Sequence, residues 1–332
     1  MAIEVGKIRN VGVVGHGGVG KTSLVEALLF SAGGLTRLGK VDDGSTTTDF
    51  DPDEIKRKIS INTAIAWCDW KSHRINLVDT PGYGDFIADA RAGLRVVEAA
   101  IVVVDAVAGV QVQTEKVWKF ANEYNLPRAV VVNRLDRERA DFYRTLESLA
   151  RRLKGRLVAL HIPVGEESSF KGFVDLVKMK SVTYANGKPA EGEIPGDLAD
   201  RVKEYREKLV EAAAETDDEL LNKYLEEGSL GEPEMLKALR AGIAEGKIVP
   251  VLCASASKMM GSLALLDLIV DSLPSPADRG EIAGTDLKSK QAGARSPDPK
   301  APVAALVFKT LSDPHIGRLS LFRVMSGTLK AD

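Results

Sequence analysis

The sequence predicts an α/β fold in which helices cover both faces of a mostly parallel sheet with one antiparallel edge. Runs of valine and isoleucine, such as 8–14, 101–104 and 129–132, alternate with helix-like segments. Continuous apolar strands of this kind are typical of parallel sheets that are buried on both faces. Residues 60–70 instead alternate around β-branched residues and lead into the strand 75–78, which indicates a hairpin and therefore an antiparallel edge.

Each expected element follows from its own pattern. Short apolar runs indicate buried strands, whereas longer stretches with apolar residues three or four positions apart indicate helices. In chain order, the first half contains strand 8–14, helix 21–32, strand 75–78, helix 90–98, strand 101–104, helix 117–123 and strand 129–132. Strand 248–252 and helix 263–273 resume the same alternation later in the chain.

The length of 332 residues predicts about two domains, and a hydrophobic content of 44% is sufficient for buried cores. Between residues 161 and 247 the pattern changes to glycine-punctuated strand-like pieces, such as 173–180, followed by an amphipathic stretch. We therefore expect a first domain of residues 1–160 and 248–280 that carries an inserted α+β subdomain at 161–247. The insertion contains 12 basic and 19 acidic residues, so it suits a protein partner better than a phosphate.

The last part of the chain has a different composition. Residues 281–301 are rich in proline, glycine, serine and lysine and indicate a linker. Residues 302–332 contain two strand-like runs, 303–309 and 319–324, and are too short to close a barrel. We expect them to be the beginning of a truncated β-barrel domain, which makes the chain a fragment.

Composition and charge exclude several classes of protein. The 45 basic and 47 acidic residues nearly balance, so the chain as a whole is not a polybasic nucleic-acid-binding protein. Cys68 and Cys253 are the only cysteines, which excludes a disulfide scaffold and a cysteine-rich zinc site. The sequence contains no signal-peptide-like start and no apolar run long enough to span a bilayer. These features predict a cytoplasmic location.

A glycine-rich stretch follows the first strand and precedes a helix. It fits the pattern G-x-x-x-x-G-K-[ST] and comprises Gly15, His16, Gly17, Gly18, Val19, Gly20, Lys21 and Thr22. The glycines allow backbone N–H groups to converge on an anion at the N-terminus of a helix. Lys21 is expected to reach the β and γ phosphates of a nucleotide, and Thr22 to offer its hydroxyl to Mg²⁺.

A second motif follows strand 75–78 and consists of Asp79, Thr80, Pro81 and Gly82. Its position at the carboxyl end of the sheet places it beside the glycine-rich loop, where ligands bind in such folds. Asp79 can hold a water molecule of Mg²⁺, and the N–H of Gly82 can meet the γ phosphate. D-x-x-G alone is usually a turn, but behind a phosphate loop it predicts the second half of a nucleotide switch.

A third motif follows strand 129–132 and distinguishes guanine from adenine. It consists of Asn133, Arg134, Leu135 and Asp136. The Asp136 carboxylate can accept two N–H bonds from guanine, whereas adenine would leave this carboxylate without donors. Arg134 can lie on the face of the base. Ser255 and Ala256, after strand 248–252, are expected to supply a backbone N–H to the guanine oxygen.

The segment 57–61 lies between these motifs in the sequence, where a mobile segment would close over a nucleotide. Its Ser60 carries a hydroxyl that can complete the Mg²⁺ shell, although an ordinary serine at the start of a strand is an alternative. Thr22, Ser60 and Asp79 are therefore the candidate metal residues, with Asp79 acting through water. Lys21 and Gly82 are candidate catalytic residues.

The glycine-rich loop, the D-x-x-G motif, the N-x-x-D motif and the pair Ser255–Ala256 follow one another in this order, with the insertion between Asp136 and Ser255. In this arrangement the chain resembles the translational GTPases and specifically elongation factor G. The same resemblance is carried by residues 79–82, 111–115, 133–137, 140–142, 246–253, 273–276 and 317–319. It extends from about residue 8 to residue 330. The resemblance implies a P-loop GTPase domain with the family's inserted subdomain, the start of a second, β-barrel domain, and GTP or GDP with Mg²⁺ as ligands.

The same resemblance implies a ribosome-stimulated GTP hydrolase in translocation or ribosome recycling. The acidic insertion resembles the part that meets the stalk proteins of the ribosome in this family. Residues 128–156 contain 9 basic and 4 acidic residues and could face ribosomal RNA, although a basic helix face is often merely solvated. We expect a monomer with no membrane partner.

Four positions depart from the family pattern, and all lie near the expected site of hydrolysis. Tyr83 stands where the family carries a histidine that orients the attacking water, so the resemblance makes Tyr83 a third candidate catalytic residue beside Lys21 and Gly82. A phenol, however, cannot become a cation near neutral pH. Gly17 replaces an apolar side chain, Gly18 an aspartate, and Ser60 a threonine. We hypothesise that Tyr83 fills the space vacated at Gly17 and that hydrolysis is slow unless the ribosome rearranges the site. These substitutions also resemble a divergent second elongation factor G of some bacteria.

Three interpretations remain open from the sequence. The first is a ribosome-dependent GTP hydrolase, including the ribosome-protection type. The second is a regulatory GTP-binding module with little hydrolysis, which the residues at positions 17, 18 and 83 favour. The third is an ATP-using P-loop kinase or ATPase, which Asn133 and Asp136 disfavour.

Overall fold

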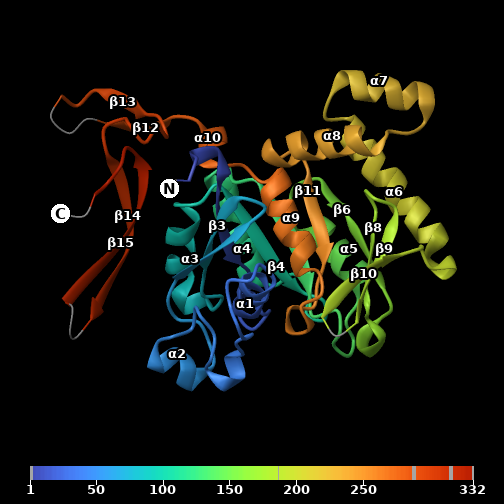
Figure 1. Ribbon diagram of the computed structural model, residues 1–332, viewed down its shortest axis with the longest axis horizontal. Coiled ribbons are helices and arrows are strands. Elements are labelled where there is room, and N and C mark those ends of the chain that lie inside the picture. The colour runs from blue at the N-terminus through green and yellow to red at the C-terminus, as the bar shows by residue number, and fades with distance from the viewer. Residues whose placement is uncertain (1–2, 186, 286–288, 314–316, 331–332) are drawn as a thin grey trace.

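A seven-stranded sheet forms the centre of the computed structural model, which describes residues 3–185, 187–285, 289–313 and 317–330 (Figure 1). The strand order is β2-β3-β1-β4-β5-β11-β6, and only the edge pair β2–β3 is antiparallel. The strands are β1 (Ile8–Val14), β2 (Ala64–Trp70), β3 (His73–Asp79), β4 (Ala99–Asp105), β5 (Arg128–Asn133), β6 (Leu157–Ala159) and β11 (Val249–Cys253). The predicted parallel sheet with one antiparallel edge is confirmed.

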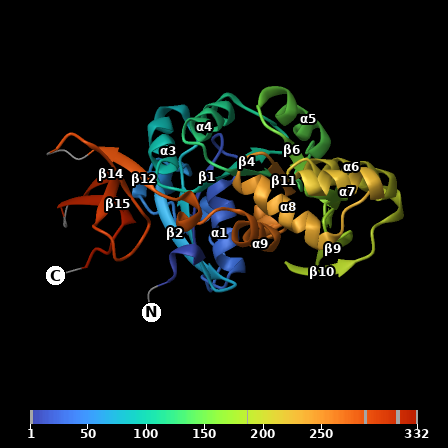
Figure 2. The same cartoon turned by 90° about the horizontal axis from the view of Figure 1, so that it is seen from above.

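Helices pack on both faces of this sheet. They are α1 (Lys21–Ser31), α3 (Ile87–Leu94), α4 (Val112–Glu123), α5 (Phe142–Arg152) and α9 (Ser262–Ser272). Two short helices lie outside these layers: α2 (Pro52–Arg57) contacts the 3₁₀ turn at Val41–Asp43, and α10 (Pro276–Arg279) contacts β1 and the 3₁₀ turn at Val5–Lys7. Helix α1 contacts α9 on one face, and α3 contacts α4 on the other (Figure 2). Every residue of β4 is buried between the two helix layers, which explains the apolar run 99–104 that precedes its final residue, Asp105.

Two helices have different bounds from those that the sequence predicts. Helix α3 ends at Leu94 rather than at residue 98. Helix α4 begins at Val112 rather than at residue 117, because Thr114 Oγ1 accepts a hydrogen bond of 3.3 Å from the N–H of Gln111 and caps its first turn. None of the helices in the described ranges combines the length and the hydropathy that a bilayer-spanning segment requires.

The inserted subdomain has its own antiparallel sheet of order β10-β9-β8-β7. Its elements are β7 (His161–Val164), β8 (Gly172–Asp175), β9 (Lys180–Ala185), β10 (Lys188–Gly192), α6 (Ala199–Ala214), α7 (Asp218–Glu227) and α8 (Glu232–Ala244). The single strand-like piece that the sequence indicates at 173–180 is divided between β8 and β9. The carboxylate of Asp175 accepts the N–H groups of Val177 and Lys178 at 2.9 and 3.0 Å, and this turn separates the two strands.

The C-terminal part forms two β-hairpins beside the main sheet (Figure 1). They are β12 (Ile282–Thr285) with β13 (Ala292–Arg295), and β14 (Ala304–Asp313) with β15 (Gly317–Ser326). The expected linker at 281–301 thus contains a hairpin, which its composition hides because β12 and β13 are largely exposed and lack an apolar alternation.

Short 3₁₀ turns connect several of these elements. They are η1 (Val5–Lys7), η2 (Val41–Asp43), η3 (Gly84–Phe86), η4 (Glu167–Ser169), η5 (Gly196–Leu198) and η6 (Ala256–Lys258).

Parts of the predicted ranges lie outside the described residues: 1–2 of the first domain, 186 of the insertion, 286–288 of the linker, and 314–316 and 331–332 of the β-barrel region.

Candidate functional site

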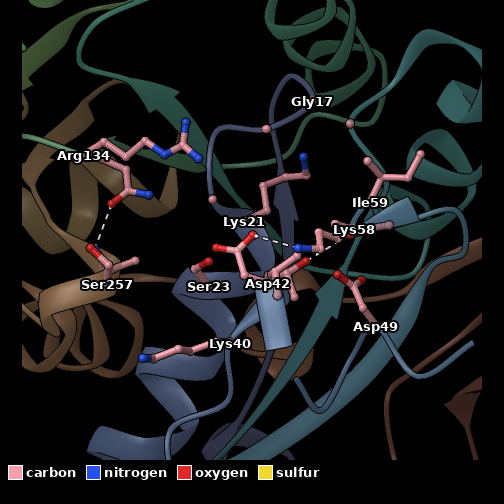
Figure 3. Close-up of a pocket in the computed structure, with 18 of the residues that line it drawn as sticks. Gly17, Lys21, Ser23, Lys40, Asp42, Asp49, Lys58, Ile59, Arg134 and Ser257 are labelled. Atoms are coloured by element: carbon pink, nitrogen blue, oxygen red, sulfur yellow. Dashed lines mark hydrogen bonds and ion pairs between the residues drawn. The ribbon is translucent and has the colours of Figure 1, made fainter. Parts of the chain in front are cut away.

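A cavity of about 320 Å³ opens at the carboxyl ends of the parallel strands, where such sheets bind ligands. Figure 3 places Arg134 and Ser257 on one side of this cavity and Lys58 and Asp49 on the other, with Lys21 between them. The predicted site residues that line the cavity are Gly17, Gly18, Gly20, Lys21, Thr22, Ser60, Gly82, Tyr83, Asn133, Arg134 and Ala256. The sequence motifs therefore converge on one cavity.

The glycine-rich loop connects β1 to the N-terminus of α1. Gly15 has a φ of +150°, and a Cβ at this position would lie 2.3 Å from the carbonyl oxygen of Val103, so only glycine fits. Lys21 is the first residue of α1, and its Nζ donates to the carbonyl oxygen of His16 at 3.0 Å. Burial lowers the pKa of Lys21 to about 8, although Asp79 and Asp49 oppose this shift. The buried ammonium at a helix N-terminus is suited to an anion.

The three candidate metal residues lie together below this loop. Thr22 Oγ1 donates to Asp79 Oδ2 at 2.9 Å and lies 3.0 Å from the Oγ of Ser60. Thr48, which belongs to none of the sequence motifs, donates its hydroxyl to the same Asp79 oxygen at 2.7 Å. Asp79 Oδ1 is buried and has no hydrogen-bond partner among the residues that the structure describes. Burial raises the pKa of Asp79 to about 6.

This set of oxygen atoms fits a magnesium ion. Carboxylate and hydroxyl oxygens are hard ligands of the kind that Mg²⁺ prefers, with waters completing its shell. A water molecule of a bound cation would also supply the partner that the buried Oδ1 of Asp79 lacks, and the positive charge would favour the ionised carboxylate. The structure thus brings together the residues that the sequence nominates for a metal.

Tyr83 lies against the glycine-rich loop. A Cβ on Gly17 would lie 2.8 Å from Cζ of Tyr83 and 2.9 Å from its Cε1, so the tyrosine ring occupies the space of a side chain at position 17. This packing confirms the hypothesis about where the Tyr83 ring lies. Gly82 is equally confined, because its Cβ would lie 2.3 Å from Nζ of Lys21 and 2.6 Å from the carbonyl oxygen of His16.

The side chain of Asn133 connects the third motif to its neighbours. Its Nδ2 donates to the carbonyl oxygen of Val19 at 2.9 Å, and its Oδ1 accepts the N–H of Ala256 at 3.0 Å. Ser255 donates its hydroxyl to Asp136 at 2.7 Å, and its own N–H donates to Met260. Both N–H groups thus have partners within the protein, and their expected bond to a guanine oxygen stays a prediction.

Arg134 lies at the mouth of the cavity in the left-handed conformation, with a φ of 66°. Its Nη1 donates to Asp105 at 3.0 Å, which fixes the guanidinium beside the glycine-rich loop. The remaining predicted residues lie behind the cavity lining and are Gly15, His16, Val19, Asp79, Thr80, Pro81, Leu135, Asp136 and Ser255. Thr80, for example, donates its hydroxyl to the carbonyl oxygen of Val13 at 2.8 Å and supports β1.

Several lining residues were not predicted. They are Ser23, Leu38, Gly39, Lys40, Val41, Asp42, Asp49, Arg137 and Ser257. Arg137 and Ser257 directly follow recognised motif residues, so extending each motif by one position would have found them. Residues 38–42 carry no such signal, because their position depends on how the loop folds over α1.

The fold and this arrangement of motifs define a P-loop GTPase domain. Residues 6–275 match the family model described as "Elongation factor Tu GTP binding domain". The chain belongs to this family of translational GTPases.

Individual relatives are similar over nearly the whole chain. Elongation factor G of Thermotoga petrophila is 42% identical over 331 residues, which cover 99% of this chain and 48% of that protein. Elongation factor G of Thermotoga maritima is 41% identical with the same coverage. A crystal structure from Thermus thermophilus is 38% identical, with a TM-score of 0.86, and the match covers 98% of this chain and 46% of that one. The predicted resemblance is confirmed, and the chain spans about half the length of the curated relatives that it matches.

Proposed function

We propose that this chain binds GTP and GDP together with Mg²⁺ and hydrolyses GTP as part of a translation factor that acts on the ribosome, in translocation or recycling. The observation that carries the proposal is the convergence of the phosphate-loop, D-x-x-G and N-x-x-D motifs at one cavity. The similarity to elongation factor G over 99% of the chain supports the choice of the ribosome as partner.

In this proposal the residues around Lys21 bind the phosphates. The Lys21 ammonium and the backbone N–H groups of residues 15–22 hold the phosphate oxygens, and the N–H of Gly82 adds a donor near the γ phosphate. Thr22 and Ser60 would hold Mg²⁺ directly, and Asp79 would hold it through water. The metal, when bound, neutralises negative charge on the phosphate oxygens.

The third motif reads the base in this proposal. Asp136 accepts two N–H bonds from the edge of guanine, while Ser255 and the ammonium of Lys258, 3.7 Å from Asp136, orient its carboxylate. Arg134 covers the face of the base. Asn133 and Ala256 are also proposed to bind the nucleotide, and the hydrogen bond between them holds both in position.

Tyr83 is proposed to act with Lys21 and Gly82 in hydrolysis. Its hydroxyl can donate or accept one hydrogen bond with the attacking water, but it cannot become a cation near neutral pH as a histidine can. We therefore expect GTP turnover to be slow without ribosomes. Comparing Tyr83→His and Tyr83→Phe for GTP turnover, with and without ribosomes, tests this role. Equal activity of the Phe variant and the wild type in both settings would show that the hydroxyl has no role.

The domain and partner assignments follow the same proposal. We assign residues 1–160 and 248–280 to the GTP-binding domain, 161–247 to the inserted subdomain, 281–301 to the linker and 302–332 to the β-barrel domain. The acidic insertion is proposed to meet stalk proteins and the basic range 128–156 to face ribosomal RNA. The factor would then act as a monomer in the cytoplasm, where translation takes place.

Binding of GDP, GTP and ATP, measured by calorimetry with and without Mg²⁺, tests whether the chain binds guanine nucleotides. We expect GDP and GTP to bind more tightly with Mg²⁺ and ATP to bind weakly; equal affinity for ATP and GTP would favour an ATPase instead. Single-turnover hydrolysis with purified ribosomes then separates a GTP hydrolase from a regulatory module with little hydrolysis. Gly17, Gly18 and Tyr83 are the residues that favour this second candidate.

A further inference from the structure

One wall of the cavity is formed by a loop that the sequence motifs do not include. Residues 38–48, here called the cover loop, contain the 3₁₀ turn η2 and contribute five consecutive residues, 38–42, to the cavity lining. The turn closes on itself, because the N–H of Lys40 donates to Ser45 Oγ at 3.0 Å and the N–H of Ser45 donates to the carbonyl oxygen of Lys40 at 3.2 Å.

A single buried carboxylate holds both ends of this turn. Glu26 lies on α1, one helical turn after Thr22, and only 1% of it is exposed. Its Oε2 accepts the N–H of Gly39 at 3.1 Å, and its Oε1 accepts the N–H of Thr47. A buried carboxylate is tolerated where hydrogen bonds replace its hydration, and bonds to an ionised acceptor are stronger than neutral ones.

The loop leaves little freedom at these contacts. A Cβ on Gly39 would lie 2.7 Å from Oε2 of Glu26 and 2.4 Å from the carbonyl oxygen of Ser45, so a side chain at position 39 would push the loop from α1. Thr48, the neighbour of Thr47, donates its hydroxyl to the same Asp79 oxygen that accepts from Thr22. Glu26 therefore fixes the loop where the cavity wall meets the metal residues.

We propose that Glu26 is a positioning residue that holds the cover loop against the cavity and thereby slows the release of bound nucleotide. The inference rests on the proposed binding of GDP. Glu26 does not line the cavity, so it acts through the loop rather than on the ligand. Both of its oxygens accept from backbone N–H groups, so a carboxylate is required rather than an amide, which would present a donor to one of them.

The test compares two variants of the full chain. Glu26→Gln is nearly isosteric but turns one acceptor into a donor. Glu98→Gln is the matched control: Glu98 is also buried, with about the same exposure (2%), but it accepts from Asn10 and pairs with Arg323 beside the amino end of β4, away from the cavity. The measurements are the release rate of a fluorescent GDP analogue and hydrogen exchange of a peptide covering residues 39–47.

We expect Glu26→Gln to release the analogue about tenfold faster and to exchange amides 39–47 faster, whereas Glu98→Gln should change neither. Gly39→Ala should mimic Glu26→Gln by displacing the loop through different atoms. If folded Glu26→Gln releases the analogue at the wild-type rate, or if Glu98→Gln accelerates release equally, the inference is overturned.

Wild-type protein gives an independent result if the Glu26 variant does not fold. Binding of GDP should slow exchange of amides 39–47, because the ligand and the loop then hold each other in place. Unchanged exchange in this peptide, despite bound GDP, would contradict the inference alone. A wild-type chain that binds no GDP would instead contradict the proposed function.

Discussion

The contact between Gly17 and Tyr83 allows a quantitative prediction. In Gly17→Ala the added methyl would lie between 2.8 and 3.0 Å from three atoms of the Tyr83 ring, which is too close for an unmoved ring. Overpacking of a closed core costs about 1–3 kcal/mol. Tyr83 is 42% exposed and can turn toward solvent, so the lower value, about 1 kcal/mol, applies. If the ring position matters for hydrolysis, turnover should fall about fivefold.

A double-mutant cycle measures this effect. Single-turnover GTP hydrolysis with ribosomes is compared for Gly17→Ala, Tyr83→Ala, the double variant and the wild type. We expect a coupling energy of about 1 kcal/mol, since the methyl is harmful only when the ring is present. The control is Gly6→Ala, because a Cβ on Gly6 would meet no heavy atom within 4 Å in the described part of the chain. The reasoning is refuted if Gly17→Ala has the same effect in both Tyr83 backgrounds.

Three further predictions concern the base, the pH and the C-terminal hairpin. Asp136→Asn should weaken GDP binding at least a hundredfold and reduce discrimination against ADP, measured by calorimetry; unchanged discrimination would contradict base reading by this carboxylate. Burial lowers the pKa of His161 to about 4, so the unfolded chain binds a proton below about pH 6.5 that the folded chain does not. The free energy of unfolding should fall as pH decreases from about 6.5 toward 4, by up to about 1.4 kcal/mol per pH unit, and His161→Phe should flatten this dependence in thermal melts. Arg323→Met removes one of the two arginines that pair with the buried Glu98, while Arg279 remains, and should cost about 2 kcal/mol in urea unfolding. Arg91→Met, at an exposed ion pair, should leave the midpoint nearly unchanged.

The sequence predicts those parts of the fold and of the site whose signal lies within a short, contiguous stretch of residues. The continuous apolar run 99–104 of β4 reveals a strand buried on both faces, because a strand covered on both sides carries apolar residues at consecutive positions. The phosphate loop is contiguous from Gly15 to Thr22, so its spacing alone identifies it. Asp79 and Asn133 each end a parallel strand, and strands of one sheet bring their carboxyl ends to the same edge.

The parts that escape prediction depend on contacts between distant residues. Glu26 is one acidic residue within a helix, and only the folded cover loop shows that it faces two backbone N–H groups. The hydrogen bond from the N–H of Ala256 to Asn133, 123 residues earlier, likewise forms only when the chain folds and leaves no pattern in the sequence. The pair β12–β13 lacks the apolar alternation by which strands are recognised, because its residues are largely exposed.

The amide of Asn133 acts as a fixed spacer between two loops. One end of the amide is bonded to Val19 in the phosphate loop and the other to Ala256 at the far side of the cavity. In the proposed function, the spacing between the loop that binds the base and the loop that binds the phosphates is therefore set before a nucleotide binds. Analogues whose sugar linkage is lengthened or shortened by one atom should be rejected through geometry, even if their base and phosphates are unaltered.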